Sequence, residues 1–144
     1  MKIFLILLML CFLFQKEALG AENPRTICYL KDRLFVQQVN DIYLNPENYR
    51  SKLIQIEGFF NSYIDENNIK RYVVFRKTAG CCENDGSSGF EFVYKKGNIN
   101  FKPDEWIFVE GIVKERLSGE PNDVYLEATS VVKKDKGDKK ELVF

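Results

Sequence analysis

Two apolar runs with a period of two residues constrain the fold of this chain more than any other feature. Within residues 53–60 and again within residues 106–114, an apolar residue or a glycine occupies every second position. This period is typical of strands that bury one face. Gly58 lies inside the first run and Gly111 inside the second. A mid-strand glycine indicates a bend or bulge, as in a sheet that curls into a small barrel.

Three more strand-like runs occupy residues 72–77, 90–94 and 124–132. They are rich in β-branched and aromatic residues, which favour strands. The polar residues 65–68 predict a turn that joins the first two strands as a hairpin. Five strands, two of them carrying glycine bends, predict a mostly β fold, a small five-stranded OB-like Greek-key barrel. A five-stranded β-sandwich or an SH3-like barrel is the alternative.

One helix is predicted ahead of the first barrel strand. Apolar residues within positions 34–43 recur near the helical period, so we expect a helix over residues 32–44. Asp32 is its expected N-cap, and the helix should end at residues 45–46 because the residue before a proline disfavours helical geometry. Residues 27–30 indicate a short strand or an extended lead-in.

The N-terminus has the layout of a secretory signal. Lys2 precedes an apolar run of twelve residues, 3–14, and small residues lie at Ala18 and Gly20. A membrane span needs about 20 apolar residues, so we expect a signal peptide over residues 1–20, cleaved after Gly20. An uncleaved anchor is the alternative. The mature protein should be periplasmic or extracellular, without a membrane span.

The composition of the mature chain excludes several classes of function. Residues 21–144 contain 19 basic and 20 acidic residues, a net charge of −1. Nucleic-acid binding normally requires a basic face, so no nucleic-acid partner is expected. The chain contains no histidine, which removes histidine-based catalysis, and we expect no enzymatic activity. One barrel domain should cover residues 21–132, followed by a charged tail at residues 133–144.

A cysteine-containing loop between the second and third barrel strands is the main candidate site. It carries Cys81 and Cys82, followed by Glu83 and Asp85. Thiolates suit soft ions such as Zn²⁺ or Cu(I), and a carboxylate can complete a zinc site. We therefore predict a metal site at Cys81, Cys82 and Asp85, to which Glu83 or Cys28 can contribute a further ligand.

Two other interpretations of the cysteines stay open. Export exposes thiols to an oxidising environment, so Cys28 can form a stabilising disulfide with Cys81 or Cys82. A bridge between the two adjacent cysteines would be strained and easily reduced. In the third interpretation, the thiols are small buried apolar groups without a ligand.

Four segments in a fixed order carry a family resemblance: Val73-Val74-Phe75-Arg76, Cys81-Cys82-Glu83-Asn84-Asp85, Phe90-Glu91-Phe92-Val93-Tyr94 and Asp104-Glu105-Trp106-Ile107-Phe108-Val109-Glu110-Gly111. They resemble the C-terminal OB-like domain, of unknown function, of the smaller subunit of two-component bacterial permeases (YcgQ-like). The resemblance extends over about residues 40–132. It implies that Cys81, Cys82 and Asp85 are the family's recurrent signature. It also implies that a membrane permease or envelope protein is the partner of an exported binding module.

Overall fold

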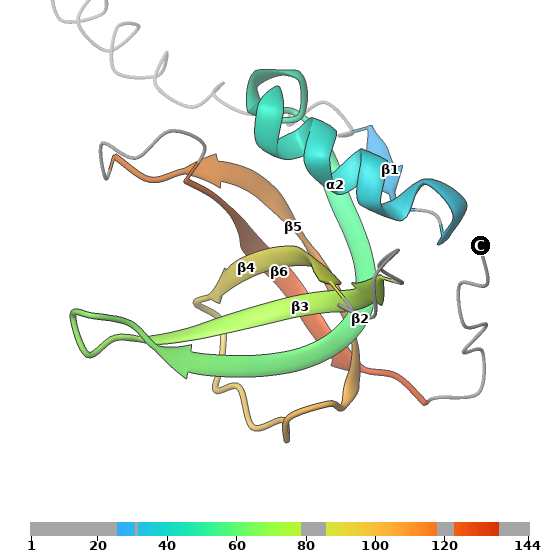
Figure 1. The fold of residues 1–144 in the computed structure, drawn as a ribbon. Coiled ribbons are helices and arrows are strands. Elements are labelled where there is room, and N and C mark those ends of the chain that lie inside the picture. Colours follow the sequence, from blue (N-terminus) through green and yellow to red (C-terminus); the bar gives the residue numbers. More distant parts are fainter. Residues whose placement is uncertain (1–25, 31, 79–85, 118–122, 136–144) are drawn as a thin grey trace, which may run out of the picture.

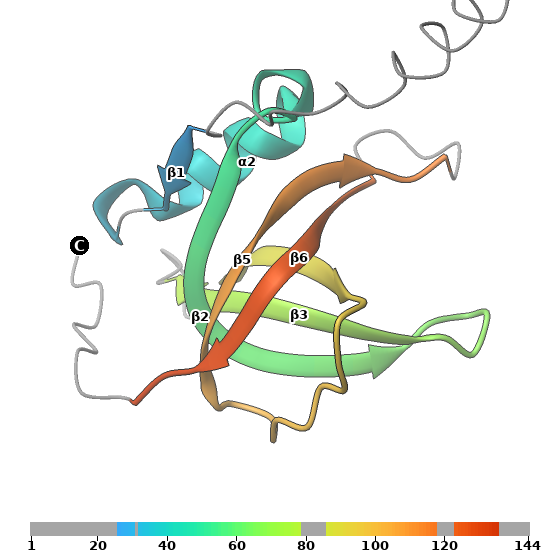
Figure 2. The ribbon, with the colours of Figure 1, turned by 180° about the vertical axis from the view of Figure 1, so that it is seen from behind.

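A computed structural model describes residues 26–30, 32–78, 86–117 and 123–135. The elements are laid out in Figure 1 and seen from behind in Figure 2. The strands are β1 (Ile27–Tyr29), β2 (Leu53–Ile64), β3 (Lys70–Thr78), β4 (Gly86–Tyr94), β5 (Trp106–Glu115) and β6 (Val124–Lys133). The helical segments are the 3-10 turns η1 (Asp32–Leu34) and η2 (Pro46–Asn48) and the α-helix α2 (Phe35–Leu44).

The strand order is that of an OB barrel. The sheet runs β1-β2-β3-β4-β6-β5, and β2 also pairs with β5, so the five strands from β2 to β6 close on themselves. Among these five strands β4 and β6 are parallel, while their other pairings are antiparallel. This Greek-key order confirms the predicted mostly β, five-stranded OB-like barrel. The short lead-in strand β1 adds a parallel edge beside β2.

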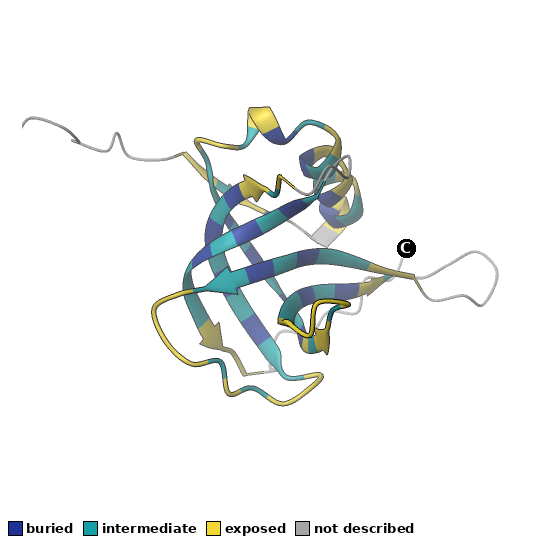
Figure 3. Cartoon of the chain, turned by 90° about the vertical axis from the view of Figure 1, so that its left-hand side faces the viewer, coloured by how far each residue is buried: buried dark blue, intermediate teal, exposed yellow. Residues whose placement is uncertain are grey.

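The barrel interior is filled by every second residue of each strand. Figure 3 shows this alternation of buried and half-buried positions along the strands. Phe60 is central, because its ring contacts Phe92 and Phe101 with ring centroids 6.4 and 5.5 Å apart. The helix α2 lies across one end of the barrel (Figure 1) and buries Phe35, Val39 and Ile42 against it. Burial of these side chains is the main force that holds the barrel together.

The two mid-strand glycines allow neighbouring backbones to approach closely. A Cβ at Gly58 would lie 2.5 Å from the Phe75 carbonyl oxygen, and one at Gly111 would lie 2.7 Å from the Glu127 carbonyl oxygen. The β5–β6 register shifts between Glu110 and Gly111. The predicted irregularity is therefore confirmed at Gly111, whereas at Gly58 the structure shows a close approach of neighbouring backbones.

The helix before the first barrel strand is confirmed, with a different start. Residues 32–34 form the 3-10 turn η1, and the α-helix begins only at Phe35. Its N-cap is Leu34, which makes no side-chain capping hydrogen bond, so the predicted N-cap at Asp32 is wrong for the α-helix. The helix ends at Leu44, and Pro46 starts η2, where a proline at the first helical position is favourable.

The third barrel strand begins earlier than its apolar pattern predicts. β4 starts at Gly86, whereas the apolar run starts at Phe90. Glycine and serine disfavour strands, but residues 86–89 pair in register with β3, from Thr78↔Gly86 to Phe75↔Gly89. Pairing with an existing strand therefore overrides the local preference of the Gly-Ser-Ser-Gly segment.

Candidate functional site

The predicted cysteine site lies outside the described residues. Cys81, Cys82, Glu83 and Asp85 all fall in the segment 79–85. The predicted signal peptide and most of the charged tail lie outside them as well. Among the residues that the structure does describe, no group of three or more histidine, cysteine or acidic side chains is arranged to hold a metal ion. Metal binding at the loop stays a prediction.

Cys28 is the one predicted site residue that the structure places. It lies in the middle of β1, opposite Ile54 of β2, and forms no disulfide within the described part of the chain. Its side chain is half-buried against the core. Burial raises the pKa of the Cys28 thiol, and nearby Lys52 partly offsets this effect. The raised pKa keeps the Cys28 thiol protonated at neutral pH. Since the thiolate is the form that binds a metal, Cys28 would have to lose a proton to bind an ion.

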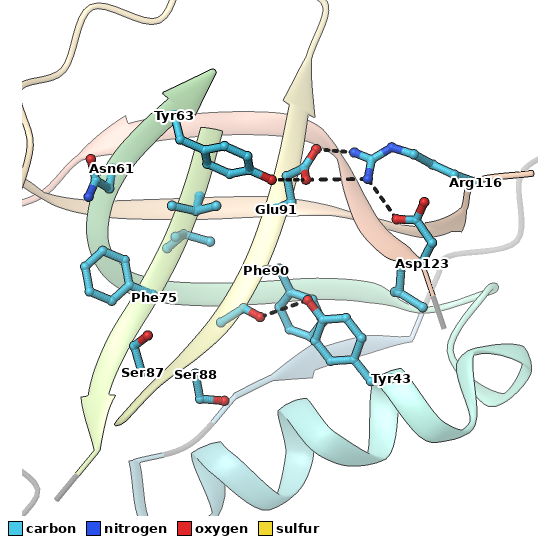
Figure 4. A pocket seen from close by; sticks show the side chains of 14 residues that line it. Tyr43, Asn61, Tyr63, Phe75, Ser87, Ser88, Phe90, Glu91, Arg116 and Asp123 are labelled. Atoms are coloured by element: carbon cyan, nitrogen blue, oxygen red, sulfur yellow. Dashed lines mark hydrogen bonds and ion pairs between the residues drawn. The ribbon is translucent and has the colours of Figure 1, made fainter. Parts of the chain in front are cut away.

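A groove on the outer face of β2, β3 and β4 is a candidate ligand site on the described surface. Its volume is about 640 Å³, a size typical of ligand sites. It extends from the β2–β3 hairpin to the two ends of the β5–β6 connection (Figure 4). The lining residues come from these elements and, with Tyr43, from α2: Tyr43, Asn61, Tyr63, Val73, Val74, Phe75, Ser87, Ser88, Gly89, Phe90, Glu91, Arg116, Asp123 and Val124.

Glu91 is the centre of an ionic network that crosses this groove. Its carboxylate accepts hydrogen bonds from the Tyr63 hydroxyl at 3.0 Å, from Arg71 at 3.4 Å and from Arg116. Arg71 also pairs with Asp65 at 2.7 Å, and Arg116 pairs with Asp123 at 2.9 Å. The charged side chains of the network are 14–23% exposed. The network therefore ties the β2–β3 turn to both ends of the β5–β6 connection, and Figure 4 shows its Glu91–Arg116–Asp123 part.

Tyr43 connects α2 to β4 at the floor of the groove. Its ring stacks on Phe90 with centroids 5.1 Å apart, and its hydroxyl donates to the Gly89 carbonyl oxygen at 3.2 Å. Burial, with the negative charges of Glu91 and Asp123 as smaller causes, raises the pKa of Tyr43 to about 12. The Tyr43 hydroxyl is therefore a hydrogen-bond donor at any physiological pH.

Sequence reasoning missed this groove. Glu91, Arg116 and Asp123 are far apart in the sequence, and each looks like an ordinary solvent-exposed charge. The one available signal was the alternation in β4, which puts Glu91 on the outer face between buried Phe90 and Phe92. That alternation does not indicate which charged side chains from other strands lie beside Glu91.

The fold and this groove define the class of the protein as a small OB-type barrel domain with an open outer face. No helix within the described ranges has the length and apolar character needed to cross a bilayer. The model of the DUF1980 C-terminal domain matches residues 14–140 of the chain. The chain therefore belongs to the family of DUF1980 C-terminal domains, which confirms the resemblance to a C-terminal domain of unknown function.

Two other comparisons add little to this assignment. No curated protein matches the chain. Among solved structures, the chain is similar to the small single-stranded DNA-binding protein from Streptomyces coelicolor, with 14% identity and a TM-score of 0.36. The likeness covers 57% of this chain and 91% of the other. DNA binding is a property of that protein.

Proposed function

We propose that this domain is an exported, non-enzymatic binding module of the cell envelope. In this proposal Cys81, Cys82 and Asp85 capture a soft metal ion, Zn²⁺ or Cu(I). The support is chemical: two thiols and a carboxylate lie within five residues of each other in a chain without histidine. Such a donor set suits these ions, and the bound metal would supply a cross-link between the loop residues.

The observation that carries the proposal is the pairing of the strands on either side of the loop. Thr78 at the end of β3 lies opposite Gly86 at the start of β4. The seven residues between them, 79–85, therefore start and finish at one pair of neighbouring backbones. Capture of one ion requires the two sulfurs and the Asp85 carboxylate to converge, and a seven-residue connection with neighbouring ends is compatible with that requirement.

Cys28 is a poor candidate for a primary ligand. Its raised pKa keeps the thiol protonated at neutral pH, and the free energy of deprotonation would lower its affinity for a metal ion. We therefore expect Cys81 and Cys82 to determine the metal affinity, with Cys28 in a minor role.

Metal analysis of the reduced, mature protein tests the proposal. Natural protein should retain about one zinc or copper ion per chain after dialysis. The Cys81→Ser/Cys82→Ser double variant should lose it, and the matched control Cys28→Ser should keep it. Absence of zinc and copper above background from natural protein loaded with either ion contradicts metal capture.

A structural role for the cysteines is the second candidate. Cys28 could brace β1 to the barrel through a disulfide with Cys81 or Cys82, because its half-buried position fixes the N-terminal segment beside β2. Such a bridge would stabilise the fold by about 2–4 kcal/mol. Thiol counting by intact mass on protein made in an oxidising compartment distinguishes the two candidates. Three free thiols in the mature chain rule out any bridge.

A further inference from the structure

One part of the groove has an aromatic floor. Phe75 of β3 is half-buried on the outer face, and its ring lies beside that of Phe59 with centroids 5.9 Å apart. Its partner on β4 is Gly89, which carries no side chain. A Cβ at Gly89 would lie 2.0 Å from the Val74 carbonyl oxygen, so no side chain fits there. The Phe75 ring is therefore not covered by a side chain from this position of β4.

Polar side chains without charge lie around this floor. Asn61 of β2 and Ser87 of β4 are diagonal neighbours of Phe75 on the outer face. Ser88 also contributes to the lining, and Figure 4 shows these residues around Phe75. Asn61 accepts a hydrogen bond from the Ser62 backbone through Oδ1. Within the described part of the chain, the Asn61 amide nitrogen and the two serine hydroxyls make no hydrogen bond, so they are available to a ligand.

The charged side chains of the groove are paired with one another. Arg116 is the one cation among the described lining residues, and it binds both Glu91 and Asp123. The lining therefore offers no uncommitted positive charge to a phosphate or a nucleic acid. Asp123 binds Arg116 through Oδ1, which leaves Oδ2 as an acceptor for a hydroxyl group. These features favour a neutral ligand that is rich in hydroxyl groups.

Pyranose sugars with equatorial hydroxyl groups have this chemistry. Each such ring presents a flat face of C–H groups, which stacks on an aromatic ring, and hydroxyl groups at its edge, which exchange hydrogen bonds with amides and hydroxyls. A second ring, that of Tyr63, is 48% exposed at the hairpin end of the groove. The volume of about 640 Å³ accommodates more than one sugar unit.

The position of the groove in the barrel agrees with such a ligand. It lies between the β2–β3 hairpin and the β5–β6 connection, which join the first to the second and the fourth to the fifth barrel strand. OB barrels bind oligosaccharides and oligonucleotides between these two connections. The paired charges of this groove favour the oligosaccharide.

We propose that the groove binds a neutral oligosaccharide of β-linked pyranose units. One sugar ring would stack on Phe75, and its hydroxyl groups would form hydrogen bonds with Asn61 and Ser87. An adjoining unit would contact Tyr63. A β-linkage between equatorial positions keeps the oligosaccharide extended, as a groove that crosses three strands requires. This inference goes beyond metal capture and does not depend on the cysteines.

The probes are cellotetraose and tetra-N-acetylchitotetraose, because both are neutral, extended and β-linked. Each is titrated into the mature natural protein and followed by NMR, beside an oligothymidine of similar length. We expect at least one tetrasaccharide to bind with a dissociation constant of about 1 mM or tighter. Its affinity should stay constant as the salt concentration rises, since no ion pair forms. The signals of the Asn61 side-chain amide and of the Ser87 and Gly89 backbone amides should shift.

A matched pair of variants tests the stacking contact. Phe75→Leu keeps an apolar side chain but removes the flat ring, and it should weaken binding about fivefold or more. Phe108→Leu is the control, because Phe108 is also half-buried on the outer face of a strand but lies outside the groove lining. This control should bind within about twofold of natural protein.

A second pair keeps the test valid if Phe75→Leu does not fold. Asn61→Ala changes an exposed side chain and should weaken binding about threefold to tenfold through the lost hydrogen bond. Asn98→Ala, at an exposed position outside the lining, should have no effect.

Several results would overturn the proposal. They are no binding of either tetrasaccharide, tighter binding of the oligothymidine, shifts confined to other parts of the barrel, or unchanged affinity in Asn61→Ala. The Cys81→Ser/Cys82→Ser variant should bind the tetrasaccharide normally. A loss of metal binding and a loss of sugar binding are therefore measured separately.

Discussion

The two seams that close the barrel differ in the extent of their pairing. β2 and β5 pair over seven residues, from Leu53↔Ile112 to Phe59↔Trp106. β4 and β6 pair over three, from Phe92↔Leu126 to Tyr94↔Ala128. We call these the closed seam and the open seam. The closed seam is bordered by fully buried aliphatic side chains, and the open seam borders the groove with its ionic network.

This difference separates a continuously paired side of the domain from a side with little strand pairing. At the closed seam, the backbone groups are satisfied by the ladder and the side chains fill the core. At the open seam, residues 86–91 of β4 have no strand partner on this side within the described residues, and Tyr43 of α2 binds the Gly89 carbonyl there. An ionic network around Glu91 connects the surrounding turns. Stability should therefore be sensitive to substitutions at the closed seam and tolerant at the open one.

Truncating a core side chain at the closed seam should have the largest effect. Ile56 is fully buried and lies opposite Val109 of β5. Ile56→Ala should reduce the free energy of unfolding by about 2–5 kcal/mol because it leaves a cavity. Ser87→Ala at the open seam should change it by less than about 0.5 kcal/mol. Urea denaturation of both variants measures this contrast, and similar losses would remove the distinction between the seams.

A methyl group at the bend of β5 should have the next largest effect. In Gly111→Ala the new Cβ would lie 2.7 Å from the Glu127 carbonyl oxygen, so the backbone must shift. We expect a loss of about 1–3 kcal/mol, as for overpacked cores. Gly97→Ala is the matched control, because its new Cβ would contact only Tyr94 at 3.5 Å. If the two variants have equal melting temperatures, the close approach at Gly111 does not constrain the fold.

The ionic network should contribute less than the core. Glu91→Gln removes the charge that Arg71 and Arg116 share. The loss should be about 1–2 kcal/mol, as for hydrogen bonds to charged groups. The control Glu127→Gln alters the exposed Lys95 pair and should cost less than about 0.5 kcal/mol. An equally small effect of Glu91→Gln would show that the network does not hold the loops of the open seam.

The pH dependence of stability should report on Tyr43 with the smallest effect. Its pKa of about 12 in the folded protein lies above the value of about 10 for an unfolded chain. The native state therefore keeps a proton that the unfolded chain loses. The resulting stability is fully present below about pH 10 and is lost as the pH rises toward 12.

Tyr43→Phe removes this titration. Between pH 9 and pH 11, its unfolding free energy should fall about 1 kcal/mol less than that of natural protein, because partial exposure weakens the effect. Chemical denaturation at the two pH values measures the difference. A parallel fall in both proteins would mean that Tyr43 titrates normally in the folded state.

The barrel strands could be predicted from the sequence because each strand is marked by a pattern within its own residues. The period-two runs around Ile56 and Val109 identify the strands of the closed seam, and Gly111 identifies the irregularity in β5. The start of β4 was not predictable in this way, because residues 86–89 form a strand only through their pairing with β3.

The groove could not be predicted because it depends on long-range register. Tyr63, Glu91 and Arg116 meet only once β2, β4 and β5 are placed around the barrel. Their spacing in the sequence follows no motif. The cysteine pair, in contrast, is obvious in the sequence, and its role as a metal site remains a proposal.

Native-state hydrogen exchange of the natural protein tests the difference between the seams most directly. The amides of Ile54, Ile56 and Val109 in the closed seam should exchange only through global unfolding, since they lie in a fully paired ladder. The amides of Ser87 and Gly89 should exchange orders of magnitude faster at the open edge of β4. Equally slow exchange at Ser87 and Gly89 would mean that this edge is covered, and would contradict the account.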